Sequence, residues 1–295
     1  MKKFYGTGVA LVTPFDLAGA VDYKSLKKLL SFTAKYGVDY YVVMGTTGES
    51  VTISPAEKQE VLNFVKKNNT AKLPIVYGIG GNNTQAVLDA IRTTDLTGVD
   101  AILSVSPYYN KPSQEGIYQH FKTIANTSPL PIILYNVPGR TASNLTAETT
   151  LRLAAHKNII GIKEASGNLE QCMRIARSKP KDFLLISGDD LLTVPIYAIG
   201  GKGVISVLAN ALPQAFKKMK EFSFANNFAK ASQYQFSLLD INGLMYEESN
   251  PVGVKQLLNQ LGVCENYVRL PLLPASAGLK QKIESAYRNY KKQKR

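Results

Sequence analysis

Short apolar runs alternate with longer segments of helical periodicity over more than two-thirds of the 295-residue chain. Each run has the length of a buried strand, and the segments between them repeat apolar residues at the three- and four-residue spacing of one helix face. Eight such units in about 225 residues predict an α/β chain, a closed (β/α)8 TIM barrel, because a doubly wound open sheet usually has fewer strands. The predicted strands are residues 8–13, 40–44, 75–79, 101–105, 132–135, 159–163, 184–187 and 204–207.

Several predicted helices carry recognisable start signals. Residues 23–36 and 86–96 show the helical spacing of apolar residues. Ser54 precedes a proline at the first helical position and a glutamate at the third, a pattern that predicts a capping box. Ser113 and Thr146 are further N-cap candidates. These signals support the alternation of strand and helix on which the barrel prediction depends.

The last part of the chain has a different pattern. Residues 213–290 look helical, with breaks expected near Pro251 and at residues 271–274. We therefore expect a catalytic (β/α)8 barrel over residues 1–225 and a C-terminal helical extension over residues 226–295. No flexible linker or low-complexity segment separates the two.

The chain is basic, with a formal net charge of +13 from 35 Lys and Arg against 22 Asp and Glu. A basic tail of the kind found here is usually a solvated helix end, and no interleaving of aromatic and basic residues typical of an RNA-binding module is present. We therefore expect no nucleic-acid partner, whereas small anionic substrates would be attracted. The basic residues of the tail are Arg288, Lys291, Lys292, Lys294 and Arg295.

Cysteine and histidine content limits the chemistry. Cys172 and Cys264 match neither a metal-ligand spacing nor a disulfide framework, which fits a reduced cytoplasm. His120 and His156 are the only histidines, and we expect them at the surface or in packing rather than in a metal site or a Ser-His-Asp triad. The first apolar stretch is too short for a signal peptide, and none can span a bilayer. The sequence thus predicts a cytoplasmic chain without metal or membrane contact.

The sixth predicted strand ends in a lysine, Lys163, which is followed by small residues and a turn. An amine attacks a carbonyl only after it has lost its proton, and the ordinary pKa of a lysine is about 10.4. Apolar surroundings can lower such a pKa by about 3 units, at a cost of roughly 4 kcal/mol. Lys163 is therefore a candidate nucleophile, although many strand-end lysines simply keep their charge in solvent.

Polar residues follow several other strands at the same end of the predicted barrel, where active sites of this fold form. The Gly45–Gly48 turn can present N–H groups and hydroxyls to a carboxylate, or it can be an ordinary turn. Arg140 suits a substrate carboxylate and equally suits a structural ion pair. Tyr135 is a site phenol or a core tyrosine, and Tyr109 a site residue or an interface aromatic. Their gathering on one face favours an active site.

With these motifs the chain resembles the dihydrodipicolinate synthase family, among the pyruvate-dependent class I lysine aldolases related to N-acetylneuraminate lyase. The resemblance covers nearly the whole chain, from residues 8–15 to residues 269–274. Gly-Thr-Thr-Gly-Glu at residues 45–49 and Gly-Ile-Lys-Glu-Ala at residues 161–165 mark the superfamily. Tyr-Asn-Val-Pro-x-Arg-Thr at residues 135–141, preceded by Tyr-Tyr-Asn-Lys-Pro, points to the synthase.

The resemblance implies a reaction and a role for particular residues. Lys163 would form a Schiff base with pyruvate, whose enamine would add to L-aspartate 4-semialdehyde in the diaminopimelate route to lysine. Tyr135 would pass protons with Thr46 and Tyr109, the last reaching in from a neighbouring subunit. No cofactor is implied, since pyruvate is itself the covalently bound substrate. The implied substrate contacts are Thr47, Ile205 through its main chain, Arg140 on the semialdehyde carboxylate, and Gly188 in the pocket wall.

The resemblance also implies a homo-oligomer, commonly a tetramer built as a dimer of dimers, because Tyr109 would complete a neighbour's site. Family members inhibited by lysine bind it at the tight-dimer interface. Here Lys58 would repel lysine, and Ala86 replaces the glutamate that pairs with its ammonium. We therefore expect weak or absent inhibition, although three residues fit the lysine-binding pattern: Ser50, Asn82 and Tyr108.

Two other functions are compatible with parts of this pattern. Another pyruvate-dependent lysine aldolase, such as N-acetylneuraminate lyase or a keto-sugar-acid aldolase, would share Lys163. Arg140 argues against it, since enzymes for polyhydroxylated substrates tend to have small or polar groups there. A non-catalytic basic barrel that binds an anionic partner would not need the reactive residues that this chain retains.

Overall fold

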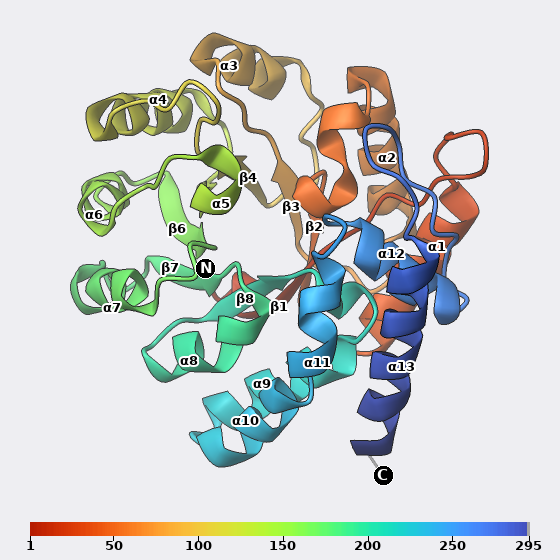
Figure 1. Ribbon diagram of the computed structural model, residues 1–295. Helices are drawn as coiled ribbons and strands as arrows, with labels where there is room; N and C mark the ends of the chain where they lie inside the picture. Colours follow the sequence, from red (N-terminus) through yellow and green to blue (C-terminus); the bar gives the residue numbers. More distant parts are fainter. Residues whose placement is uncertain (294–295) are drawn as a thin grey trace.

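The computed structural model describes residues 1–293, and its eight parallel strands close into a barrel in the order β1 to β8 (Figure 1). Strand β1 (Gly6–Ala10) pairs with β2 (Tyr40–Val43) on one side and with β8 (Gly203–Ser206) on the other, which closes the ring. Every predicted run overlaps one of the eight strands, so the barrel prediction is confirmed. The other strands are β3 (Ile75–Gly78), β4 (Ala101–Val105), β5 (Ile132–Asn136), β6 (Ile159–Glu164) and β7 (Leu184–Ser187).

Helices connect the strands and form the outer ring, as Figure 1 shows. Ser54 and Glu57 form the predicted capping box, and Ser113 and Thr146 cap their helices as expected. Each cap satisfies an N–H group that has no partner inside the helix. The helices of the ring are α1 (Tyr23–Lys35), α2 (Pro55–Asn68), α3 (Thr84–Thr93), α4 (Gln114–Thr127), α6 (Ala147–Ala154), α7 (Leu169–Ser178), α8 (Thr193–Ala198) and α9 (Pro213–Phe224), with a short additional helix α5 (Pro138–Thr141).

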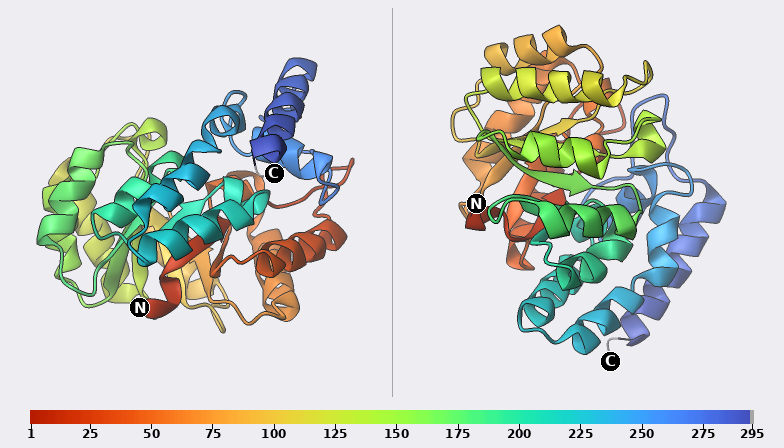
Figure 2. Two further views of the ribbon diagram at one scale, coloured as in Figure 1. Left: turned by 90° about the horizontal axis from the view of Figure 1, so that it is seen from below. Right: turned by 90° about the vertical axis from the view of Figure 1, so that its left-hand side faces the viewer.

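Up to residue 293, the C-terminal extension contains four further α-helices and lies at one side of the barrel, coloured from cyan to dark blue in Figure 2. Helix α10 packs on α8 and α9, whereas α11 and α12 contact the turns η4 and η5, which follow β7 and β8. The extension therefore reaches the end of the barrel where the strands finish. Its elements are α10 (Phe228–Phe236), α11 (Leu239–Asn242), η6 (Gly243–Met245), α12 (Val252–Gln260) and α13 (Ala277–Gln293), and the turns are η4 (Asp190–Leu192) and η5 (Leu208–Asn210).

The helical breaks predicted near Pro251 and at residues 271–274 are confirmed, and a further break separates α9 from α10. The boundary that we propose between barrel and extension lies in that further break. Helix α13 carries three of the predicted basic tail residues, and Lys294 and Arg295 lie outside the described residues. No helix within residues 1–293 is both long and apolar enough to cross a membrane.

Side chains of the strands alternate between the inside of the barrel and the layer beneath the helices, because successive residues of a strand point to opposite faces. On β2, Tyr40 and Val42 belong to the inner cluster, while Tyr41 and Val43 belong to the outer one. The inner cluster includes Tyr135, which lies next to the C-terminal end of β5. Aromatic and branched side chains therefore fill the barrel and form the floor beneath its open end.

Gly8 leaves the space in which the ring of Tyr40 lies. A Cβ atom at this position would lie 2.2 Å from Cε2 of Tyr40, far inside van der Waals contact. Gly8→Ala is therefore expected to lower the free energy of unfolding by about 1–3 kcal/mol, which denaturant titration would measure. Gly243→Ala is the control, since its Cβ would meet nothing within 4 Å, and its stability should be unchanged or slightly raised. Equal stability of the two variants would contradict this account.

Candidate active site

Lys163 lies one residue before the end of β6 and points into the barrel. It pairs in register with Tyr135 on β5, and its Nζ lies 4.2 Å from the centre of the Tyr135 ring. Both side chains are buried, with 5% and 6% of their surface exposed. None of the hydrogen bonds or ion pairs within residues 1–293 involves the Lys163 side chain. The amine is thus held by packing on an aromatic face and is not tied to a carboxylate.

Glu164, the next residue on β6, points the opposite way into a polar network beneath the helices. Its buried carboxylate accepts hydrogen bonds from Asn136 Nδ2 at 3.0 and 3.1 Å, from the Ser166 N–H at 2.8 Å and from Gln171 Nε2 at 2.8 Å. Asn136 also donates to Asn144 at 2.8 Å. Since buried carboxylates without partners are costly, this network fixes the end of β6 and therefore the base of Lys163.

Gly188 follows β7 and packs tightly against the end of β6. Its N–H donates to the Glu164 carbonyl at 2.7 Å, and a Cβ atom there would lie 2.5 Å from Cβ of Ala165. Ile205 is fully buried in the inner cluster on β8. Both predicted contact residues therefore lie at the strand ends, on the side of the barrel that includes β7 and β8.

The turn after β2 carries Thr46 and Thr47 in a short 3-10 helix, η2 (Thr46–Gly48). Thr46 is half-buried, whereas Thr47 is buried and accepts a hydrogen bond from Asn250 Nδ2 at 3.0 Å. The Gly48 carbonyl accepts another from Thr13 Oγ1 at 2.8 Å. The turn is therefore anchored both to the barrel and to the C-terminal extension.

A cavity of about 740 Å³ opens at this end of the barrel and is lined by Thr46, Tyr135 and Arg140. It continues between α2 and α3, where Lys58 and Tyr108 belong to its wall. Lys163 is not itself a lining residue, and it contacts the cavity only through the Tyr135 ring. The cavity is large enough for two small organic acids, and Arg140 gives it a cation at its exposed side.

Tyr109 is not among the residues that line this cavity. Its side chain is 88% exposed, and its backbone has a positive φ of 71°, which is uncommon for a residue other than glycine. Val51 is also 85% exposed, so two large apolar side chains stand in solvent near the cavity rim residue Tyr108. Within one chain, Tyr109 therefore does not line the cavity together with Tyr135 and Thr46.

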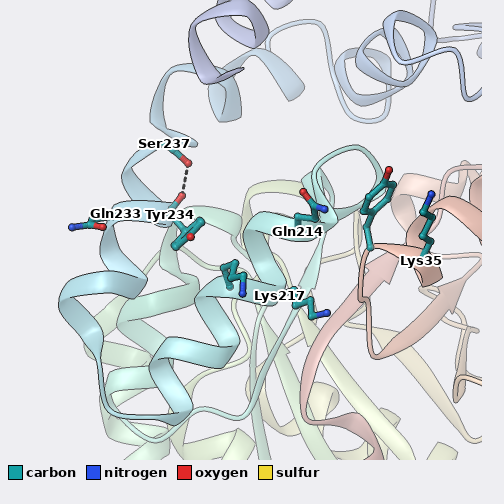
Figure 3. Close-up of a pocket in the computed structure, with 8 residues that line it drawn as sticks. Lys35, Gln214, Lys217, Gln233, Tyr234 and Ser237 are labelled. Atoms are coloured by element: carbon teal, nitrogen blue, oxygen red, sulfur yellow. Dashed lines mark hydrogen bonds between the residues drawn. The ribbon is translucent and has the colours of Figure 1, made fainter. Parts of the chain in front are cut away.

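A second cavity, of about 480 Å³, lies on the outside of the barrel between α1, α9 and α10 (Figure 3). None of the predicted site residues lines it. Figure 3 shows Ser237 donating a hydrogen bond to the Tyr234 carbonyl beside it. The remaining lining residues are Lys35, Tyr36, Gln214, Lys217, Lys218 and Gln233.

Asp190, in η4, is a fully buried carboxyl group that sequence reasoning did not select. The Leu208 N–H donates to its Oδ2 at 2.8 Å, while Oδ1 has no hydrogen-bond partner among the described residues. Burial raises the pKa of Asp190 to about 6, and the Leu208 amide, Ser206 and the charge of Lys163 partly oppose the shift. Asp190 is therefore mostly protonated below about pH 6 and mostly ionised above it.

This raised pKa predicts a pH-dependent stability. The unfolded carboxyl has a pKa near 3.8, so its protonated form stabilises the fold fully below pH 4, and that contribution is lost as the pH rises through about 6. Asp190→Asn cannot titrate. We expect the wild type to lose about 2 kcal/mol of unfolding free energy relative to Asp190→Asn between pH 4 and pH 7, measured by urea titration. A difference that does not change with pH would contradict the shift.

The remaining predictions on individual residue types concern histidine, cysteine and metal. His120 is buried, contacts Thr84 through Nδ1 at 2.8 Å, and has its pKa lowered to about 4 by burial, so it is a packing residue as expected. Cys172 and Cys264 are both free and buried. Within residues 1–293, no group of three or more His, Cys, Asp or Glu residues could hold a metal ion.

Comparison with known proteins agrees with this geometry. Residues 3–289 match the model of the dihydrodipicolinate synthetase family. The chain is 51% identical to the 4-hydroxy-tetrahydrodipicolinate synthase of Cytophaga hutchinsonii over 97% of each chain. It superposes with a TM-score of 0.95 on the dihydrodipicolinate synthase of Thermotoga maritima, with 36% identity over 98% of this chain and 99% of the other. The enzyme of Cyanidioschyzon merolae with lysine bound is similar too, with a TM-score of 0.94 and 40% identity over 98% and 99%.

Proposed function

The chain belongs to the dihydrodipicolinate synthetase family, and from this premise we propose how its residues catalyse the condensation of pyruvate with L-aspartate 4-semialdehyde. It is a lyase of the aldolase type with the activity of 4-hydroxy-tetrahydrodipicolinate synthase, on the route through diaminopimelate to lysine. The observation that carries the mechanism is the buried Lys163 amine, which lies against the ring of Tyr135, a residue that lines the cavity, and which forms no ion pair within residues 1–293.

In the first half-reaction, the Lys163 amine attacks the ketone carbon of pyruvate, and loss of water leaves a Schiff base. A proton then leaves the methyl group and gives an enamine, whose carbon is the nucleophile. We assign the transfer of these protons to Tyr135, and the contact between its ring and Lys163 Nζ supports this role. A neutral phenol does this without adding a fixed charge beside the amine. Thr46 and Thr47 present hydroxyls either to the pyruvate carboxylate or to the chain of hydroxyls through which Tyr135 would pass protons.

In the second half-reaction, the enamine carbon bonds to the aldehyde carbon of the semialdehyde, and the aldehyde oxygen takes up a proton. The amine of the semialdehyde then attacks the imine carbon, closes the ring and releases the Lys163 amine. Arg140 binds the carboxylate of the semialdehyde at the exposed side of the cavity, and Gly188 and Ile205 contact the substrates from the ends of β7 and β8. No cofactor is needed, because Lys163 supplies the electron sink.

Borohydride trapping tests this mechanism. The protein is incubated with pyruvate, reduced, and digested for peptide mass spectrometry, and the incubation is repeated with the semialdehyde added before reduction. We expect a pyruvyl adduct on Lys163 that the semialdehyde discharges. An adduct that the semialdehyde leaves untouched would contradict the second half-reaction, and folded protein without any adduct would overturn the first.

Arg140→Met is expected to raise KM for the semialdehyde at least about tenfold, because a charge-assisted bidentate pair with the substrate carboxylate is lost. KM for pyruvate and the yield of the trapped pyruvyl adduct should stay near wild type, since Arg140 is not placed on that substrate. Steady-state kinetics with each substrate varied in turn gives both values. A rise in KM for pyruvate alone would reassign Arg140 to the first substrate.

We also propose a homotetramer, a dimer of dimers, in which Tyr109 of one subunit completes the relay of the next. The exposure of Tyr109 and Val51 beside the cavity supports this arrangement, because exposed apolar groups of this size are typical of interfaces. The two unpaired, buried cysteines support a reducing compartment, the cytoplasm.

Weak or absent inhibition by lysine remains our proposal. Lys58 is half-buried in the wall of the cavity between α2 and α3, and Ala86 lies exposed on α3, so this groove offers a cation and no carboxylate at those two positions. Lysine at submillimolar concentration should leave the steady-state rate unchanged. Clear inhibition would mean that other residues, such as Asp89 in the same wall, bind its ammonium.

A further inference from the structure

We propose that the buried ion pair between Glu49 and Lys255 is a positioning device that sets the turn carrying Thr46 and Thr47 for pyruvate. The C-terminal extension is then part of the catalytic apparatus and not only a cover on the barrel. The inference rests on the proposed function, since it assigns a role to residues that support the pyruvate end of the same site.

The ion pair has a short N–O distance and is shielded from solvent. Lys255 Nζ lies 2.5 Å from Glu49 Oε1, and the two side chains are 0% and 3% exposed. Lys255 also donates to the Tyr267 carbonyl at 2.8 Å, and Glu49 Oε2 accepts the Arg269 N–H at 3.0 Å. The Phe15 ring lies 4.2 Å from Lys255 Nζ. Every polar atom is therefore directed at a definite partner, and Glu49 is held from the side of the extension at both oxygens.

Glu49 transmits this restraint directly to the turn. It follows η2 in a left-handed conformation, with φ 54° and ψ 34°, and its N–H donates to the Thr46 carbonyl at 3.0 Å. Asn250, also in the extension, binds the Thr47 hydroxyl. The extension thus holds the two threonines at two points, and a shift of the Glu49 side chain moves the peptide on which they lie.

Stability alone does not account for a buried pair of this kind. Removing two charges from water costs about as much as their attraction returns, and well-packed apolar residues of similar size often stabilise a protein equally well or better. Burial lowers the pKa of Lys255, while the Glu49 carboxylate opposes that shift. Compared with an apolar contact, the two charged groups add hydrogen bonds of defined direction. A directional contact matters most where a turn has to present two hydroxyls to a small substrate.

Three variants separate positioning from folding: Glu49→Gln, Lys255→Met, and the two combined. Each single change leaves one buried polar partner unpaired and is expected to lower the melting temperature clearly. The double variant removes both charges and should recover much of that loss. Its kcat/KM for pyruvate should nevertheless remain at least about tenfold below wild type, and its pyruvyl adduct should form correspondingly more slowly in borohydride trapping.

The control is a second ion pair, between Asp39 and Lys220 at the other end of β2, whose side chains are 25% and 22% exposed. Lys220 Nζ lies 2.6 Å from Asp39 Oδ1, and Asp39 also accepts a main-chain N–H, from Thr7. Asp39→Asn combined with Lys220→Met should change the melting temperature but leave the kinetics with pyruvate within about twofold of wild type.

The outcomes are distinct. Wild-type protein that forms no adduct refutes the proposed mechanism, whatever the variants do. If the wild type forms the adduct and the folded double variant matches its trapping rate and its KM for pyruvate, the positioning role of the pair is wrong. If the control pair slows trapping as much as the Glu49–Lys255 pair, the effect is a general loss of stability and the inference is likewise overturned.

Discussion

Lys163→Met is expected to reduce kcat by at least about 10³-fold and to abolish the trapped pyruvyl adduct, because it removes the amine to which we assign the Schiff base. Methionine nearly conserves the volume of the lysine stem, so the contact with the Tyr135 ring is retained and the fold should be kept. Peptide mass spectrometry after borohydride reduction, together with steady-state kinetics, measures both effects.

Lys58→Met is the matched control for this change. Lys58 lies in the wall of the cavity that Tyr135 also lines and is half-buried, but it has no role in our mechanism. It should form the adduct at the wild-type rate. If Lys163→Met still formed an adduct, and the modified peptide contained Lys58, the amine that reacts with pyruvate would have been assigned wrongly.

Tyr135→Phe is expected to lower kcat by about 10²-fold to 10⁴-fold, because the hydroxyl that moves protons at the Schiff base is removed while the ring under Lys163 remains. The KM for pyruvate should change much less than kcat. The rate of adduct formation and the steady-state rate, each measured across pH, would show whether the loss lies in proton transfer.

Tyr40→Phe provides the comparison, since Tyr40 is also a tyrosine of the inner barrel cluster. Its hydroxyl is buried and has no hydrogen-bond partner among the described residues, so its removal leaves no group unsatisfied. Activity should stay near wild type, and stability should be unchanged or higher. Equal losses of kcat in Tyr40→Phe and Tyr135→Phe would indicate damage to the barrel and not a lost proton relay.

The barrel was predictable from the sequence because its strands are local apolar runs separated by capped helices. The first strand shows the limit of that signal. Its predicted range, residues 8–13, continues past the observed end at Ala10, since Leu11 and Val12 are apolar and buried too. They make irregular contacts instead: the Val12 N–H donates to Asn210 Oδ1 at 3.1 Å. Burial alone does not distinguish a strand from a buried loop.

The site was predictable where its residues end neighbouring strands. Lys163 and Tyr135 meet because β5 and β6 are adjacent and in register. Asp190 and the pair of Glu49 with Lys255 were not selected, because their partners lie far away in the sequence. One signal was available for Lys255: it is a lysine within a helix, α12, whose residues 252–258 are all buried. A charged residue in such a run requires a partner, but only the fold shows which.

The Glu49–Lys255 contact joins residues 206 positions apart, and Val12 meets Asn210 across 198 positions. During synthesis, the turn with Thr46 and Thr47 emerges from the ribosome long before the helix that fixes it. A nascent chain can thus carry a complete set of barrel strands while its pyruvate site is still loose. If the proposed positioning role is correct, the enzyme becomes active only after α12 has been translated, and a product truncated before α12 would contain Lys163 without the contact that positions the turn.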